Sequence, residues 1–229
     1  MEPKQQRSRQ TLTRLLDAAE ALLDENGLDA ATVPAIAERA GVSVGVVYRR
    51  FRNKDELLRA VYERFFQRAL QSNRTAMLSS ATLDLPFRKL ARAVVQGIVR
   101  GQRMRRNLLV ALRRYAETHR DPAFRREAAD LNREGAVALT HLLLRFRDEI
   151  HHPDPEKAIH FALLTIGAVL YAVLQEDGDA THGLTPPENL EHELTRMFFT
   201  YLGISDEDDD EDAASEAIAI QPSGEHPNA

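Results

Sequence analysis

The chain contains no cysteine among its 229 residues, which excludes a disulfide framework and any thiolate metal site. Its first ten residues, MEPKQQRSRQ, lack the apolar run of a secretory signal. The longest apolar stretch, Phe161 to Leu174, has 14 residues, whereas a bilayer span needs about 20. We therefore expect a cytoplasmic protein with no membrane partner, in which this stretch forms a buried core or interface helix.

The signatures of catalysis are also lacking. There is no Gly-rich phosphate loop, no HExxH motif and no nucleophile elbow, so we predict that the protein is not an enzyme and uses no cofactor. A metal-dependent all-helical enzyme stays open as an alternative, because two predicted loops collect side chains that bind metals. They hold His151, His152, Asp154 and Glu156 in the first loop, and His182, Glu188 and His192 in the second.

Negative charge is concentrated at one end of the chain. The whole chain has a net charge of −5, but nine of its 35 acidic residues follow Ser205, where there is no Lys or Arg. Residues 1–204 therefore hold 30 basic and 26 acidic residues, a net charge of +4. The acidic segment has the composition of a disordered tail, and the body that precedes it is mildly basic.

Almost every segment before residue 205 has a helical hydrophobic period, and none alternates as a strand does. With 43% hydrophobic residues, the chain can bury a core, and the expected architecture is all-α, with a compact N-terminal helical unit before a larger bundle. Gly101 is one of the expected breaks. The expected helices are a first one ending at Asn26–Gly27, then residues 33–40, 43–51, 54–70, 84–100, 103–119, 122–151 with a bend, 155–175 and 187–204.

The sequence AGVSVGVVYRRF, from Ala40 to Phe51, has the features of a helix-turn-helix. Gly41 falls where the chain must turn, and we predict a positive φ there because glycine adopts it without penalty. Ser43 is predicted to cap the next helix through its hydroxyl. This arrangement explains the first glycine as a hinge between two short helices.

The second glycine, Gly45, falls in the first turn of the following helix, where a bare backbone permits close approach to a phosphate or a base edge. Val47 and Phe51 are expected to point back to the first helix. Tyr48 and the two arginines after it then face outward, which suits a DNA major groove. A solvated amphipathic face is the alternative interpretation of these outward residues.

The segment TVPAIAERAGVSVGVVYRRFRNKDELLRAV resembles the signature of the TetR family of transcriptional regulators, with Thr, Ile-Ala, Ala-Gly-Val-Ser, Gly, Val-Tyr, Phe, Lys and Leu in the family's order. The resemblance covers residues 9–69. It departs from the family at Val33-Pro34, where Thr then Arg are common, and at Arg50, where His is common. The resemblance implies DNA contacts from Ser43, Val44, Gly45, Val46, Tyr48, Arg49, Arg50 and Lys54.

The resemblance also implies a function and a domain plan. The protein would be a ligand-responsive repressor that binds a pseudo-palindromic operator in double-stranded DNA as a homodimer and is released by a small, hydrophobic effector. A ligand-independent DNA-organising protein with the same head is the alternative. The domain plan is an N-terminal arm at 1–8, a DNA-binding domain at 9–69 with its helix-turn-helix at 32–51, a helical effector-binding and dimerisation domain at 70–204, and an acidic disordered tail at 205–229.

Two expectations concern the larger bundle. The apolar helix at 161–174 and the apolar face of the final helix are expected to pair with their copies in a second subunit, because a helix apolar around most of its circumference needs cover on more than one side. Aromatic and hydroxyl side chains are candidates to line an effector cavity, although no effector-binding residue is assigned. These candidates are Tyr115, Phe124, Phe146, Phe161, Thr165 and Tyr171.

Overall fold

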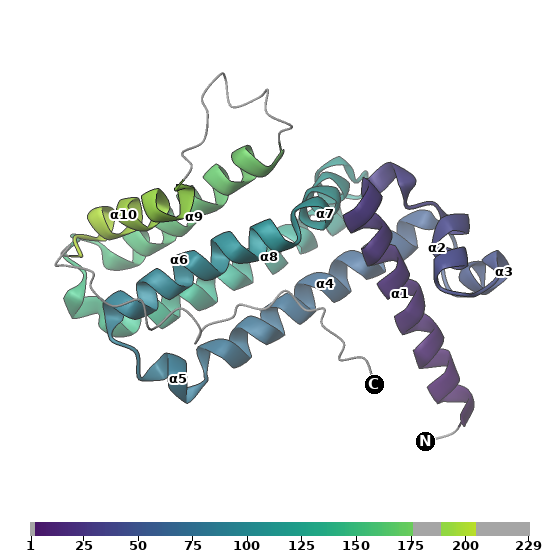
Figure 1. The fold of residues 1–229 in the computed structure, drawn as a ribbon, viewed down its shortest axis with the longest axis horizontal. Coiled ribbons are helices and arrows are strands. Elements are labelled where there is room, and N and C mark those ends of the chain that lie inside the picture. Colours follow the sequence, from purple (N-terminus) through teal and green to yellow (C-terminus); the bar gives the residue numbers. More distant parts are fainter. Residues whose placement is uncertain (1–2, 176–188, 205–229) are drawn as a thin grey trace. The chain divides into compact units, whose positions relative to one another are not determined.

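A computed structural model describes residues 3–175 and 189–204 of the chain (Figure 1). All regular structure in these residues is helical, which confirms the all-α prediction. The helices are α1 (Pro3–Ala30), α2 (Val33–Arg39), α3 (Val44–Tyr48), α4 (Lys54–Met77), α5 (Ser80–Leu83), α6 (Phe87–Met104), α7 (Arg106–Thr118), α8 (Pro122–Leu143), the 3₁₀ helix η1 (Leu144–Glu149), α9 (Pro155–Gln175) and α10 (Leu190–Leu202).

Most predicted helix boundaries lie within a few residues of the observed ones, and one predicted break is wrong. Gly101 lies inside α6, and the break comes at Arg105, whose φ of −123° and ψ of 34° interrupt the helix before α7. An isolated glycine is tolerated inside a helix, at a cost of about 1 kcal/mol relative to alanine. The bend predicted within residues 122–151 is present after α8 as η1, in which Phe146 has non-helical angles.

Three further predictions concern the ends of helices and the segments next to them. Gly27 interrupts α1 with a φ of 73°, as its place in the predicted stop suggests. Residues 3–8, expected to form an arm, belong to α1. Of the second predicted metal-binding loop, His182 and Glu188 lie outside the described residues, as does the acidic tail, whereas His192 belongs to α10.

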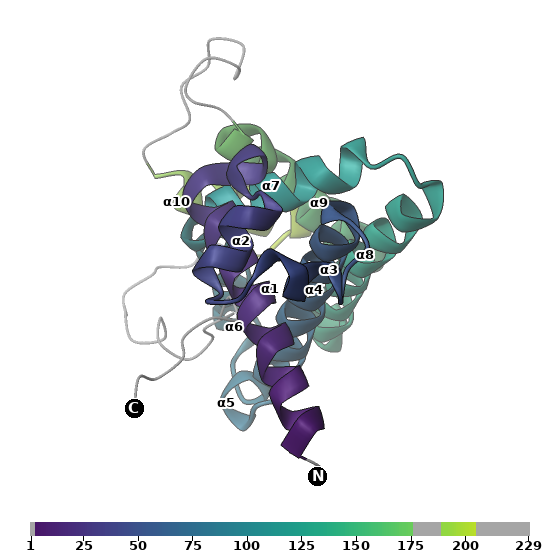
Figure 2. The same cartoon turned by 90° about the vertical axis from the view of Figure 1, so that its right-hand side faces the viewer.

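The described residues divide into two compact units. The first contains residues 3–67 and 105–128, so α7 and the start of α8 pack with the N-terminal helices. In this unit α3 leads directly into the N-terminal end of α4 (Figure 1, Figure 2). Its core is made by the apolar stripes of α1, α2, α4 and α7, including Leu15, Ala19, Leu23, Ile36, Leu57, Val61, Leu108 and Leu112.

Charged side chains also hold the first unit together. Glu20 of α1 is buried, and Arg64 of α4 donates a hydrogen bond from Nε to its Oε1 over 2.9 Å. Asp24 accepts from the backbone N–H of Leu108 over 3.1 Å and forms an ion pair with Arg105. Because a buried carboxylate is costly unless it is paired, these partners fix α4 and α7 against α1.

The second unit contains residues 68–104, 129–175 and 189–204. Its core lies between α6, α9 and α10, where the apolar face of each helix is directed inward, and it includes Leu90, Val94, Val99, Ile159, Ala162, Ile166, Leu194, Phe198 and Leu202. Over Pro155–Val173, α9 has the length and mean hydropathy of a membrane-crossing helix. A core or interface helix of a soluble protein meets the same criteria, so this is weak evidence for a membrane span.

Candidate DNA-binding surface

The turn between α2 and α3 has the predicted geometry. Gly41 has a φ of 63°, which confirms the left-handed conformation expected of it. The backbone N–H of Val42 donates to the carbonyl of Ala37 over 3.0 Å, and that of Gly41 to the carbonyl of Glu38 over the same distance. These bonds satisfy the last carbonyls of α2 and set the angle at which α3 leaves it.

The predicted cap at Ser43 is only half correct. Ser43 occupies the N-cap position of α3 with extended angles, but its hydroxyl makes no capping hydrogen bond. At the start of α2, by contrast, Thr32 Oγ1 accepts from the N–H of Ala35 over 3.3 Å. Both Ser43 and Gly45 are exposed, so water can serve the first amides of α3 in place of the hydroxyl.

The two faces of α3 separate as the sequence predicts. Val47 is 1% exposed and Phe51, just beyond the helix, is buried as well. Tyr48 is 54% exposed, and Val44 and Arg49 also face solvent. The helix is shorter than expected, since it ends at Tyr48 instead of near Phe51, and Val46 is half-buried.

Gly45 is not required by the fold of the protein itself. Its φ is not positive, and a Cβ built there would meet only the hydroxyl oxygen of Ser43, at 3.9 Å. A helical glycine costs about 1 kcal/mol relative to alanine. The outer face of α3 therefore has a bare, exposed patch of backbone that no internal contact demands.

Two of the expected DNA contacts are anchored to α1 and to the segment after its kink. The guanidinium Nη2 of Arg50 lies 2.5 Å from the carbonyl oxygen and 2.8 Å from Oγ of Ser8. Lys54 is half-buried and donates from Nζ to the carbonyl of Leu28 over 3.1 Å. Arg50 and Lys54 each keep further N–H donors beyond these bonds. Both side chains could therefore still bind a phosphate.

The start of α4 is capped by residues that the sequence analysis did not assign to the site. Asn53 Oδ1 accepts from the N–H of Glu56 over 2.8 Å, and Glu56 Oε2 accepts from the N–H of Arg52 over 2.5 Å. The pattern Asn-x-x-Glu before an apolar run is the sequence signal for such a cap. Lys54 therefore stands at a capped helix N-terminus, where the amide dipoles favour an anion.

An exposed second helix after a glycine turn, with a basic helix N-terminus beside it, defines the class of helix-turn-helix DNA-binding proteins. The model described as "Bacterial regulatory proteins, tetR family" matches residues 15–61, and "Tetracyclin repressor-like, C-terminal domain" matches residues 86–202. The chain belongs to the TetR family of transcriptional regulators.

Curated relatives are similar over part of their length. The HTH-type transcriptional repressor KstR of Mycolicibacterium smegmatis is 37% identical over 82 residues, covering 36% of this chain and 39% of that protein. The HTH-type transcriptional repressor Rv3405c of Mycobacterium tuberculosis is 37% identical over 95 residues, covering 40% and 50%. The chain thus spans half or less of the length of these relatives.

Solved structures share the fold over most of the chain. A transcriptional regulator from Rhodococcus sp. Rha1 matches with a TM-score of 0.61 at 24% identity, covering 84% of this chain and 96% of that one. The TetR family regulator PfmR from Thermus thermophilus matches with a TM-score of 0.57 at 16% identity, covering 83% and 98%. At these identities the likeness establishes the fold alone.

The aromatic residues expected around an effector fall in both units. In the first unit Tyr115 packs against Phe124, with ring centroids 5.5 Å apart. In the second unit Phe146 stacks on Phe87 at 5.3 Å, while Phe161 is exposed. Which of these side chains contacts an effector stays a prediction.

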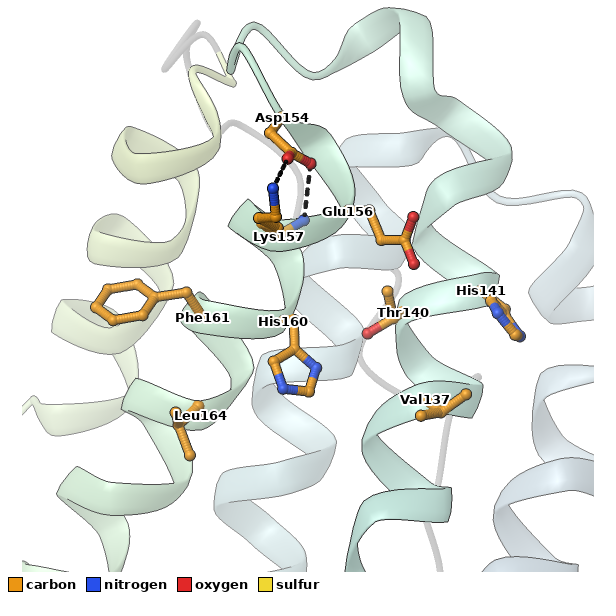
Figure 3. A pocket seen from close by; sticks show the side chains of 9 residues that line it. All are labelled: Val137, Thr140, His141, Asp154, Glu156, Lys157, His160, Phe161 and Leu164. Carbon is orange, nitrogen blue, oxygen red and sulfur yellow. Dashed lines mark hydrogen bonds and ion pairs between the residues drawn. The ribbon is translucent and has the colours of Figure 1, made fainter.

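The second unit has a groove of about 530 Å³ between α8 and the first turns of α9 (Figure 3). Thr140, Glu156 and His160 lie along it, whereas Phe161 projects toward α10 (Figure 3). At its end Lys157 Nζ lies 2.7 Å from Asp154 Oδ2 and holds the pKa of that carboxyl below its usual value. The other lining residues are Val137, His141 and Leu164.

The predicted metal-binding loop at the start of α9 is organised by backbone bonds. His152 Nδ1 lies 3.1 Å from the backbone N and O of Asp154, and His151 Nδ1 lies 3.1 Å from the carbonyl oxygen of Gly203. In the part of the chain that the structure describes, no three His, Cys, Asp or Glu side chains converge as a metal site requires. This loop thus gives the metal-dependent alternative no support.

Proposed function

We propose that the protein is a transcriptional repressor that binds a pseudo-palindromic operator as a homodimer and is released by a small hydrophobic effector. The observation that carries the DNA-binding part is the exposed backbone at Gly45, between outward-facing Val44 and Tyr48 on α3. A bare helix start can approach a base edge or phosphate closely, and Arg49 at its end can reach guanine. The DNA contacts assigned to the eight residues in and after α3 are part of this proposal.

Dimerisation is supported by an exposed apolar face on the last two helices. Phe161 and Leu164 of α9 are 54% and 61% exposed, and Tyr201 of α10 is 39% exposed. The rings of Phe161 and Tyr201 are 5.4 Å apart, so they form one continuous patch. Burying this patch against its copy in a second subunit would remove apolar surface from water. The two recognition helices of the dimer would need a spacing of about 34 Å, one turn of B-DNA, to read successive major grooves.

The hydrophobic effector is inferred from the apolar interior of the second unit, whose buried residues are almost all aliphatic or aromatic. A ligand that stabilises one of two dimer conformations would change the spacing of the recognition helices and shift the population away from the DNA-bound form. A thermal-shift screen tests this element. Stabilisation by hydrophobic compounds supports it, and no stabilisation by any compound favours the ligand-independent alternative.

The decisive experiment is selection of bound duplexes from genomic fragments, followed by fluorescence anisotropy over a range of salt concentrations. Lys54→Ala should weaken all sites alike and reduce the salt slope by about 1. Arg49→Ala should cost about 1–3 kcal/mol and relax preference at one base pair. Lys89→Ala removes an exposed lysine of α6 and is the matched control. Absence of any selected duplex would refute the DNA-binding function.

Dimerisation has its own test by sedimentation velocity. Phe161→Asp should convert the dimer to monomer, because a charge would be buried without a partner in the apolar patch. Leu78→Asp places the same charge at an apolar residue that is 67% exposed in the same unit and should leave the dimer intact. A dimeric Phe161→Asp variant would exclude this face as the interface.

A further inference from the structure

The end of α7 makes a set of hydrogen bonds to the first turn of α4. The hydroxyl of Tyr115 lies 2.9 Å from the carbonyl oxygen of Asp55 and 3.0 Å from its Oδ1. His119 Nε2 lies 3.1 Å from Oδ2 of the same carboxylate. Both partners come from residues about 60 positions further along the chain. Asp55 directly follows Lys54, so these bonds act on the turn that contains the proposed phosphate contact.

The bonds to His119 determine which of its nitrogens carries hydrogen. Its Nδ1 accepts from the backbone N–H of Asp121 over 3.1 Å. A neutral imidazole has one acceptor and one donor, so Nε2 holds the hydrogen and donates it to Asp55. The side chain of His119 is only 9% exposed, and its ring lies 4.6 Å from that of Phe124. The donor is therefore fixed in direction by packing and by a backbone bond.

Tyr115 is held in the same way. It is buried, and its ring packs against both His119, at 5.2 Å, and Phe124, at 5.5 Å. Burial, followed by the hydrogen bond to Asp55, raises the pKa of its hydroxyl above the ordinary value. The phenol therefore keeps its proton at neutral pH, and its single hydrogen is shared between the carbonyl oxygen and the carboxylate of Asp55.

Asp55 itself is not held by burial, since its side chain is 56% exposed. An unrestrained carboxylate in the first turn of a helix is attracted to the amide dipoles at that N-terminus. A DNA phosphate next to Lys54 would use the same dipoles, and two anions there would repel each other. The donors from α7 draw the Asp55 carboxylate to themselves and limit this competition.

One turn further along α4, a second set of contacts supports the same arrangement. Arg59 Nη2 lies 2.5 Å from Oε2 of Glu127, and its guanidinium lies over the ring of Phe124 at 5.1 Å. These contacts, like those of Tyr115 and His119, lie wholly within the first unit. The first two turns of α4 are thus attached to α7 and the start of α8.

We propose that Tyr115 and His119 are positioning residues for DNA binding, which direct the Asp55 carboxylate toward α7 so that Lys54 and the N-terminus of α4 are open to a phosphate. This inference rests on the proposed DNA-binding function. It assigns a role in operator affinity to two side chains that touch no DNA.

The test is a double-mutant cycle on operator affinity, measured by fluorescence anisotropy. Tyr115→Phe removes the hydroxyl and should raise Kd on the order of tenfold, the effect expected for losing a hydrogen bond to a charged group. In the Lys54→Ala background it should raise Kd less than twofold, because the contact that it positions is absent. Tyr62→Phe is the control, since Tyr62 is buried in the same unit and bonds the carbonyl of Ala128 instead.

A second pair of variants separates positioning from a loss of stability. Asp55→Ala removes the carboxylate but keeps the backbone carbonyl that Tyr115 also bonds, so Tyr115→Phe should raise Kd less than twofold in that background, and the double variant should bind more tightly than Tyr115→Phe alone. Equal Kd for Tyr115→Phe and wild type, or a full tenfold effect in both the Lys54→Ala and Asp55→Ala backgrounds, would overturn the inference. If the wild-type protein itself binds no duplex, the proposed function fails, and the inference fails with it.

Discussion

Substituting Gly45 with alanine should make the protein more stable and a weaker DNA binder. The residue lies in the first turn of α3, and its φ is not positive. The added methyl group would meet only Ser43 Oγ, at 3.9 Å, which is an ordinary contact. The substitution therefore introduces no strain or clash within the protein.

The two effects can be estimated separately. Replacing glycine with alanine at a compatible helical position stabilises by about 0.4–1 kcal/mol, chiefly because the unfolded chain becomes less flexible. For a chain of this length, that corresponds to a rise in Tm of about 1–4 °C. If DNA backbone or bases approach the bare Cα, the methyl group blocks the contact, and a tenfold loss of affinity would correspond to about 1.4 kcal/mol.

Thermal unfolding and fluorescence anisotropy with the selected operator measure the two quantities on the same samples. Gly101→Ala is the matched control, because Gly101 is also helical and its added methyl group would have no neighbouring atom within 4 Å. It should give a similar rise in Tm with unchanged Kd. A Gly45→Ala variant that binds the operator as tightly as wild type at every salt concentration would refute the close approach of DNA to α3.

Three other predictions concern the acidic tail, two glycines with positive φ, and the ion pair between Arg39 and Glu25. Truncation after Ile204 removes nine acidic residues and no Lys or Arg, so non-specific DNA affinity should rise at low salt; unchanged affinity would show that the tail does not compete with DNA. Gly203→Ala should destabilise more than Gly41→Ala in urea unfolding, because both have positive φ but only the methyl at 203 would lie 2.8 Å from another side chain. The hydrogen bond from Arg39 lowers the pKa of Glu25 below its ordinary value, so the pair stabilises the fold above the ordinary pKa of a glutamate and loses its effect as the pH falls through the lowered pKa. Glu25→Gln should therefore show a smaller loss of stability on acidification, and an identical pH profile would contradict this.

Local patterns account for what the sequence predicted well. The helical periods located nearly all of the long helices, and the glycine turn gave the correct sign of φ at Gly41. The partition of Val47 inward and Tyr48 outward follows from the 100° step between successive helical residues and from their polarity. Each of these features depends on residues within one or two turns of each other.

Helix ends and side-chain partners that depend on residues far along the chain could not be predicted from local sequence patterns. Gly101 suggested a break, but α6 continues through it to Met104, and the helix is interrupted at Arg105 instead. The candidates for an effector cavity share aromatic or hydroxyl side chains. In the structure Phe146 packs against Phe87, and Phe124 packs against Tyr115. A composition that suits a cavity suits a filled core equally well, so the sequence could not separate the two.

The contacts of Asp55 show why this matters for function. Its position beside Lys54 marked a helix start, but nothing local indicates that Tyr115 and His119, about 60 residues away, would bond its carboxylate. Because α7 packs in the same compact unit as the helix-turn-helix, the geometry of the N-terminal end of α4, the proposed phosphate site, depends on a segment outside the recognisable motif. Mutational analysis confined to the motif would therefore attribute to Lys54 alone an affinity that also depends on the side chains that keep a neighbouring anion away from it.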